Sequence, residues 1–187
     1  MLPDVSRLAH HHAAAERLGD TLRSLGITAS FVRRHSLPGD DLRSPLTPTR
    51  EALLRADEPA FAAFLLLFCR QPSQLLEWCD DSLLDSGVLV RNAAGEWIAP
   101  FHLRVVDRLY LFSDYLGTDP DAVMGAGETT ELLYQAAMPQ QPVETLLDWG
   151  CGAGTLALLI ASRAVSVTGA DINDRAIQLA RWNAAVN

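Results

Sequence analysis

The sequence contains no lysine, and all 15 of its strongly basic residues are arginines. We interpret this absence as a coding bias and attach no function to it. The 15 arginines stand against 23 acidic residues, which leaves a formal net charge of −8. Such a balance argues against a broad surface for non-specific nucleic-acid binding, although it leaves room for a local basic patch.

Cysteine is scarce, and long apolar runs are missing. The three cysteines, Cys69, Cys79 and Cys151, are too far apart for a metal motif and indicate a reducing compartment. The N-terminus has no basic segment followed by an apolar core, so we expect no signal peptide. The apolar run 61–69 is too short to span a bilayer. We therefore predict a cytoplasmic protein with no membrane partner.

Three consecutive histidines, His10 to His12, invite a metal assignment. Neighbouring side chains on a helix point in different directions, so three in a row cannot converge on one ion. We interpret them as surface residues and predict no metal site.

The most informative feature is a glycine-rich turn between an expected strand and an expected helix. The turn, Asp148-Trp149-Gly150-Cys151-Gly152-Ala153-Gly154-Thr155, follows the apolar run 143–147 and precedes the helical run 156–161. A buried strand that enters a glycine-rich turn and then a helix is typical of a Rossmann-like α/β sheet. Thr155 occupies the place of the third glycine of the dinucleotide fingerprint, so a dinucleotide is not the favoured ligand.

The acid before the turn bears on the choice of cofactor. Asp148 would repel a pyrophosphate, whereas it suits an ammonium or sulfonium group. Glycines at 150, 152 and 154 allow a ligand to lie on the backbone and allow positive φ. Cys151 has no obvious basic neighbour, so we interpret it as a small packed residue and not as a nucleophile.

A second acid follows at the expected place. The run 165–171 is predicted to be the next strand and ends in Asp171, about twenty residues after the first glycine, where Rossmann-like sheets bind ribose hydroxyls. Asn173 is then a natural N-cap, and Asp174 lies in the first turn of the next helix. The alternative for the whole motif is an ordinary tight turn of an α/β protein.

These residues resemble a known family. Asp148 to Gly154 resembles motif I of class I S-adenosylmethionine-dependent methyltransferases, and Asp171-Ile172-Asn173 resembles the motif that follows, together with Ala176, Ala180, Asn183 and Asn187. The form is closest to the small-domain branch, which includes release-factor glutamine and ribosomal-RNA guanine-N2 methyltransferases. The resemblance covers residues 121–187. Within it, 121–130 resembles the segment that lies over the cofactor, with Thr129 or Thr130 as a helix cap; an ordinary loop is the alternative.

The resemblance implies S-adenosyl-L-methionine as cofactor and assigns roles to seven residues. Gly150, Cys151 and Gly152 would form the floor under the amino-acid end of the cofactor, and Asp148 would attract its positive charge. Asp171 would fix the ribose, and Ile172 would border the adenine. Gly154 completes the predicted cofactor-binding set. The branch holds its methyl acceptor with an Asn-Pro-Pro motif, which does not occur in these residues. We therefore predict no catalytic residue, and the acceptor stays unknown.

The expected fold class is α/β, with a Rossmann-like methyltransferase sheet of which only the first two strands are present. Residues 117–187 are predicted to be the first part of the methyltransferase domain. A mainly helical, winged-helix-like domain at 1–116 precedes it. Two strands alone would leave an apolar edge and face uncovered. We therefore expect a C-terminally truncated sequence, inactive alone, or a sheet completed by a second chain.

The N-terminal part shows helical patterns followed by strand patterns. Helices are expected at 2–25, 27–34, 49–56, 58–70, 73–79 and 81–86, a loop at 35–48, a hairpin from 87–91 and 96–101, and one or two further strands within 103–115. The candidate recognition helix of this module, 73–81, carries three acids and no base, so we expect no DNA readout and favour a structural or substrate-covering role. The alternatives for Arg33, Arg34, Arg43, Arg50 and Arg55 are a basic patch or a solvated surface.

Three functions remain open at this point. The first is methylation of a nitrogen in RNA or in a protein glutamine. The second is methylation of a small molecule, with the N-terminal module as a lid or a dimerisation element. The third is a non-catalytic interaction protein that retains the cofactor turn.

Overall fold

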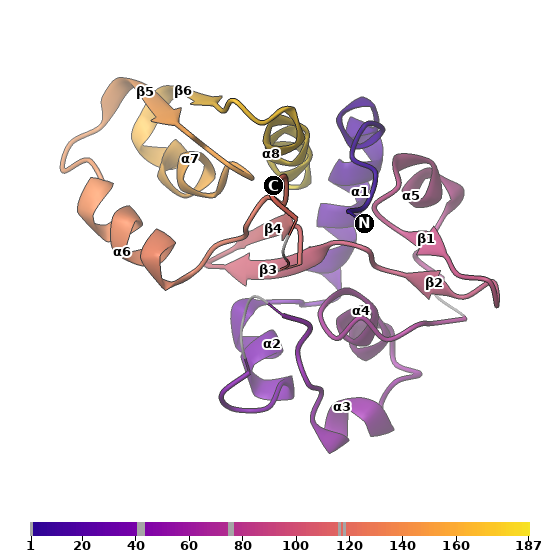
Figure 1. The fold of residues 1–187 in the computed structure, drawn as a ribbon. Coiled ribbons are helices and arrows are strands. Elements are labelled where there is room, and N and C mark those ends of the chain that lie inside the picture. Colours follow the sequence, from indigo (N-terminus) through magenta and orange to yellow (C-terminus); the bar gives the residue numbers. More distant parts are fainter. Residues whose placement is uncertain (1, 41–43, 75–76, 116, 118) are drawn as a thin grey trace.

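The computed structural model describes residues 2–40, 44–74, 77–115, 117 and 119–187. Its first half is mainly helical and ends in two hairpins, and its second half alternates helices with parallel strands (Figure 1). The elements of the first half are η1 Leu8–His10, α1 His12–Ser24, α2 Ala29–His35, α3 Arg50–Leu54, α4 Pro59–Leu67, α5 Asp81–Ser86, β1 Val90–Arg91, β2 Trp97–Ile98, β3 His102–Val106 and β4 Leu109–Ser113. Those of the second half are α6 Glu128–Ala137, β5 Val143–Trp149, α7 Thr155–Ile160, η2 Ala161–Arg163, β6 Ala164–Ala170 and α8 Asp174–Val186.

Three helices of the first half, α2, α3 and α5, begin at a residue whose side chain caps the helix. The Thr28 hydroxyl accepts a hydrogen bond from the Phe31 N–H, and the Thr49 hydroxyl accepts one from the Ala52 N–H. The Asp80 carboxylate caps α5 by accepting from the N–H groups of Ser82 and Leu83. Helix α4 has Pro59 in its first turn and is buried along almost its whole length. It is therefore a core helix, as its uniform hydrophobicity indicates.

Two expected helices differ from the structure. The helix expected at 2–25 is divided, because His11 takes a non-helical conformation between η1 and α1. The helix expected at 73–79 is wrong at its start: Ser73 forms an antiparallel bridge with Trp97, with N···O distances of 3.1 and 2.7 Å. The backbone groups of Ser73 thus extend the first hairpin and are not available to a helix. Residues 75 and 76 of this expected helix lie outside the described part of the chain.

Both hairpins are present. Strands β1 and β2 are antiparallel, and the side chain of Asn92 closes their turn by accepting hydrogen bonds from Ala94 and Glu96. Strands β3 and β4 pair from His102 opposite Ser113 to Val106 opposite Leu109. The hairpins and the further strands are therefore confirmed, while the winged-helix assignment stays a prediction.

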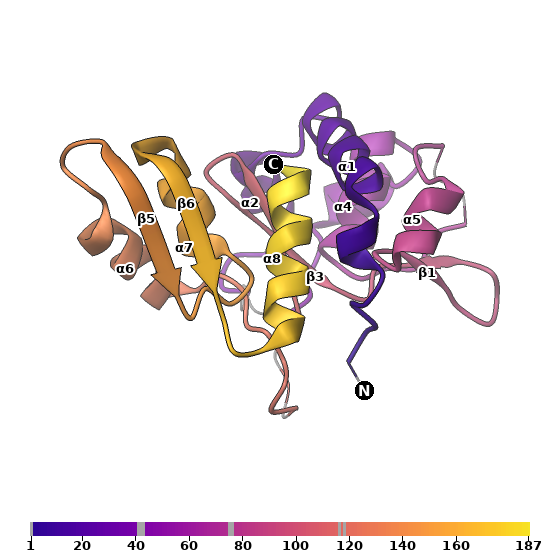
Figure 2. The same cartoon turned by 90° about the horizontal axis from the view of Figure 1, so that it is seen from above.

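In the second half, β5 and β6 run parallel, with Asp148 opposite Gly169 and Trp149 opposite Ala170. Helix α7 crosses between them and packs against one face of the pair. The other face carries Leu147 and Trp149, which are 58% and 84% exposed. The mixed α/β class is thus present, and among the described residues this face of β5 and β6 is open to solvent (Figure 2).

Helix α8 joins the two halves. It packs against α1, η1 and β4, and its buried residues share one continuous core with the N-terminal helices (Figures 1 and 2). Trp182 of α8 meets Phe112 of β4 edge to face, with ring centroids 6.2 Å apart. The domain boundary at 116/117 stays a prediction, and the core itself is continuous across it.

Candidate cofactor site

The glycine turn begins where β5 ends, and its three glycines have positive φ values. These are +80° for Gly150, +52° for Gly152 and +79° for Gly154, a region that residues with a Cβ disfavour. A Cβ on Gly150 or Gly152 would meet no atom within 4 Å, whereas one on Gly154 would lie 3.1 Å from the Ala180 Cβ. Gly150 and Gly152 are therefore free to face a ligand, and Gly154 is required for packing against α8.

Asp171 ties the turn to the end of β6. One of its carboxylate oxygens accepts a hydrogen bond from the Gly152 N–H at 2.8 Å, and the other accepts one from the Asn173 N–H at 2.9 Å. These backbone donors, that of Asn173 first, lower the pKa of the Asp171 carboxyl. A carboxylate offers about four lone-pair positions, so the group can still accept bonds from the two hydroxyls of a ribose.

Asp148 lies below the turn and not on its surface. Its carboxylate accepts a hydrogen bond from the Ala157 N–H at 3.0 Å, near the start of α7. Burial raises the pKa of the Asp148 carboxyl, with a further contribution from the negative charge of Asp171. The structure thus gives Asp148 a role in holding α7, in addition to the charge attraction predicted for it.

Cys151 is packed inside the turn. Its thiol is buried, and a Cβ on Gly169 of β6 would lie only 3.0 Å from its sulfur. Burial first, then the charges of Asp148 and Asp171, raise the pKa of the Cys151 thiol. These features agree with a packed residue, since a nucleophilic cysteine needs its thiolate form stabilised.

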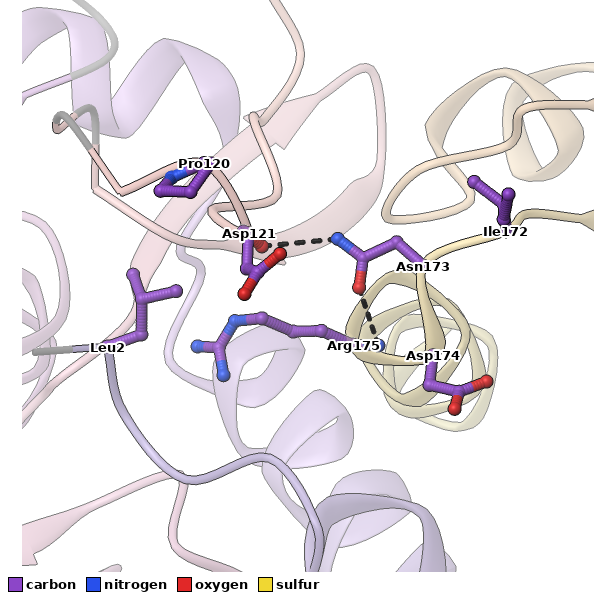
Figure 3. A pocket seen from close by; sticks show the side chains of 7 residues that line it. All are labelled: Leu2, Pro120, Asp121, Ile172, Asn173, Asp174 and Arg175. Carbon is purple, nitrogen blue, oxygen red and sulfur yellow. Dashed lines mark hydrogen bonds between the residues drawn. The ribbon is translucent and has the colours of Figure 1, made fainter.

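The turn after β6 presents Ile172 and Asn173 to the surface. Ile172 is fully exposed, and it shares an open hollow with Leu2, Pro120, Asp121, Asn173, Asp174 and Arg175 (Figure 3). Asn173 caps α8 by accepting a hydrogen bond from the Arg175 N–H at 2.9 Å, as its position in the sequence predicts. Its amide also donates to the Asp121 carbonyl at 3.2 Å, which brings the segment before α6 to the same place.

That segment differs in detail from the expectation. Helix α6 begins at Glu128 with Gly127 as its N-cap, and Thr130 contributes from within the first turn by accepting a bond from the Gly127 N–H. Neither Thr129 nor Thr130 is the cap, because a glycine one position before the helix takes that place. A Cβ on Gly125 would lie 2.5 Å from the Ser113 hydroxyl, so its close contact is with β4.

Asn183 and Asn187 of the second motif have structural partners that the sequence did not show. The Asn183 amide exchanges hydrogen bonds with the N–H and C=O of Phe112, at 2.7 and 2.9 Å, and also donates to the Ala153 carbonyl in the glycine turn. The Asn187 amide does the same with the N–H and C=O of Tyr110. The side chains of Asn183 in α8 and of Asn187, which follows α8, thus form hydrogen bonds with the backbone at the edge of β4, as a neighbouring strand would.

Of the predicted site residues, the structure brings Asp148, Cys151, Gly152 and Asp171 together around one turn, with Gly150 and Ile172 on its exposed side. Gly154 lies behind it. Among the described residues, no group of three or more histidines, cysteines or acids is placed to hold a metal. Within that same part of the chain, no helix is long and apolar enough to cross a membrane.

The second half is a mixed α/β unit in which a glycine-rich turn joins β5 to α7 and β5 runs parallel to β6. A family model described as the methyltransferase small domain matches residues 125–187. The resemblance of this part to class I methyltransferases of the small-domain branch is thereby confirmed.

The curated relatives that the chain matches include methyltransferases of three kinds. The chain is 31% identical over 144 residues to a release factor glutamine methyltransferase of Aliivibrio fischeri, covering 71% of this chain and 49% of the relative. It is 41% identical over 76 residues to a ribosomal protein L11 methyltransferase of Burkholderia thailandensis, covering 38% and 25%. It is also 44% identical over 61 residues to an uncharacterized RNA methyltransferase of Listeria innocua, covering 31% and 14%. The chain therefore spans at most about half the length of these relatives.

Proposed function

We propose that the protein is a methyltransferase that binds S-adenosyl-L-methionine at the glycine turn. One observation carries the cofactor assignment: Asp171, at the end of β6, holds the Gly152 N–H of the turn and keeps acceptor positions free. In this proposal Gly150, Cys151 and Gly152 lie under the amino-acid end of the cofactor, and Asp171 binds the ribose. Ile172 borders the adenine, while Asp148 attracts the positive end from below.

The bound cofactor would supply an electrophilic methyl group on a sulfonium. Transfer of this methyl group to an acceptor nitrogen would leave the neutral thioether S-adenosylhomocysteine and release one proton. Such a displacement needs alignment more than acid–base assistance. The contribution of the described residues is then to bind and orient the cofactor.

A protein glutamine or an RNA nitrogen is the acceptor that we favour. Of the three relatives above, only the release factor enzyme aligns over 71% of this chain, which extends well into the N-terminal part. The RNA methyltransferase aligns over 31%. This difference favours the protein glutamine of a release factor, with the N-terminal helices covering the acceptor. A small-molecule acceptor and a non-catalytic role are the alternatives.

The cofactor assignment is tested by isothermal titration with S-adenosylmethionine and S-adenosylhomocysteine. Asp171→Ala removes the ribose acceptor and the bond to Gly152, so we expect an affinity at least about tenfold lower. Glu144→Ala, which removes an exposed acid from β5, is the matched control and should bind as the wild type does. Equal affinities of wild type and Asp171→Ala would contradict the assignment.

The acceptor is tested separately with a tritiated methyl donor. Purified release factor, ribosomal RNA and a buffer blank are incubated with the protein, and label is counted in each. Label in the release factor, at glutamine by mass spectrometry, supports the first proposal. Label in RNA alone moves the acceptor to a nucleobase nitrogen.

A further inference from the structure

A buried ion pair connects the end of β4 to the start of α8. The Arg175 guanidinium donates to both carboxylate oxygens of Asp114, with N···O distances of 2.5 and 2.8 Å. The Asp114 side chain is 1% exposed and that of Arg175 is 12% exposed. A third nitrogen of the guanidinium donates to the Pro3 carbonyl at 2.6 Å. The pair is therefore well satisfied in spite of its burial, unlike an ordinary surface salt bridge.

The same carboxylate also holds the segment before α6. An Asp114 oxygen accepts a hydrogen bond from the Val123 N–H at 2.8 Å, and the Asp114 N–H donates to the Val123 carbonyl at 3.0 Å. Asp114 thus fixes two segments at once, the one around Val123 and the first turn of α8.

These two segments meet again at the hollow beside the cofactor turn. The Asn173 amide bridges them, donating to the Asp121 carbonyl while its oxygen caps α8 at the Arg175 N–H (Figure 3). Asn173 is in turn bonded through its own N–H to Asp171, whose other oxygen holds Gly152. A continuous set of hydrogen bonds therefore runs from Asp114 to the glycine turn.

We propose that Asp114 and Arg175 are a positioning pair for the cofactor, a role that rests on the proposed function. The pair sets the start of α8, and with it Asn173 and Asp171, so that the Asp171 carboxylate meets the ribose. Through Val123 it also keeps the 119–125 segment beside the same turn. Breaking the pair leaves a buried charge without its partner, and the turn moves to solvate it.

The test is a double-mutant cycle on ligand affinity. Asp114→Asn, Arg175→Gln and the double variant are titrated with S-adenosylhomocysteine below their melting temperatures, with folding checked by circular dichroism. We expect each single variant to bind about tenfold more weakly. The double variant, whose two neutral amides can bond to each other, should recover part of the affinity instead of showing the product of the two losses.

A purely structural role is separated by a control elsewhere in the same core. Tyr110→Phe removes the buried hydrogen bond from the Tyr110 hydroxyl to the Ile27 carbonyl, measured at 2.9 Å, and lowers stability without touching the hydrogen bonds around the turn. It should bind the ligand as the wild type does. Unchanged affinity in both single variants, or an equal loss in Tyr110→Phe, would overturn the positioning role. If the wild type itself does not bind, the proposed function fails, which is a different outcome.

Discussion

At the scale of single residues, the pKa values of the two acids of the site, Asp148 and Asp171, are shifted in opposite directions. The pKa of the Asp171 carboxyl is lowered because backbone N–H groups of Asn173 and Gly152 stabilise its charge. The pKa of the Asp148 carboxyl is raised because it is half-buried below the turn. The first acid therefore stabilises the fold as an anion, whereas the charge of the second costs folding free energy.

This difference predicts opposite effects of removing the charge. Asp171→Asn should lower the free energy of unfolding at pH 7, and the loss should disappear as the pH falls through the depressed pKa of the folded protein. Asp148→Asn keeps an acceptor for the Ala157 N–H and removes the buried charge, so it should stabilise the protein at pH 7. That gain should shrink as the pH falls and Asp148 of the wild type takes up its proton.

The measurement is urea unfolding of both variants and the wild type at several pH values between about 3 and 7, around the ordinary aspartate pKa of about 4. Glu144→Gln, an exposed acid on β5, is the control and should follow the wild-type curve. Curves that shift in the same direction for both aspartate variants would show that the environments of the two carboxyls are not as described.

At the scale of elements, the distinctive contact is between α8 and the edge of β4. Asn183 and Asn187, one helical turn apart, bond to Phe112 and Tyr110, which are two residues apart on the strand. The first spacing places the two amides on one face of the helix, and the second directs the backbone groups of Phe112 and Tyr110 to the same edge of the strand. The helix therefore satisfies the backbone groups that an edge strand leaves unpaired.

Removing the inner amide should be costly. Asn183 is fully buried and makes three hydrogen bonds, so Asn183→Ala leaves the Phe112 N–H and the Phe112 and Ala153 carbonyls without this partner. We expect a loss of about 3 kcal/mol in the free energy of unfolding, measured in urea. Asn187→Ala, at the exposed end of α8, should cost about 1 kcal/mol. Similar costs for the two would mean that burial does not set the difference.

The elements that the sequence predicted correctly are those with local signals. The glycine turn, the cap at Asn173 and the hairpin turn at Asn92 depend on residues within a few positions of one another. The helix expected at 73–79 was wrong at its start, because a bridge from Ser73 to Trp97, more than twenty positions away, decides the conformation of Ser73. Contacts such as Asp114 with Arg175 have no local signal, since only tertiary packing brings them together.

The site shows the same division. Asp171 could be assigned from its distance to the first glycine, and its bond to Gly152 agrees with that position. The attachment of Asp148 to α7 could not be assigned, because an acid at a strand end can point either to the ligand or to the following helix. The resemblance marked Asn183 as a motif residue, but its partner on β4 required the fold.

At the scale of the whole molecule, one core runs from the N-terminal helices into α8. Leu8, Leu18 and Leu22 belong to the same buried cluster as Leu179 and Trp182. Strands β5 and β6 stand apart from it, since one of their faces carries exposed Leu147 and Trp149. The stability of the chain should therefore be unevenly distributed, with the β5–β6 pair as its weakest part.

Hydrogen exchange measured by mass spectrometry at increasing urea tests this distribution. Peptides from α4 and α8 should exchange only by global unfolding, so their opening free energies should agree and fall with the same urea slope. Peptides from β5 and β6 should open at lower free energy and with a smaller slope, because less surface is exposed when they separate. If α8 instead opened together with β5 and β6, and α4 stayed protected, the boundary near residue 117 would divide the chain into two cooperative units. Added S-adenosylhomocysteine should raise the protection of β5, β6 and the glycine turn more than that of α4, because a ligand stabilises the states that contain its folded site.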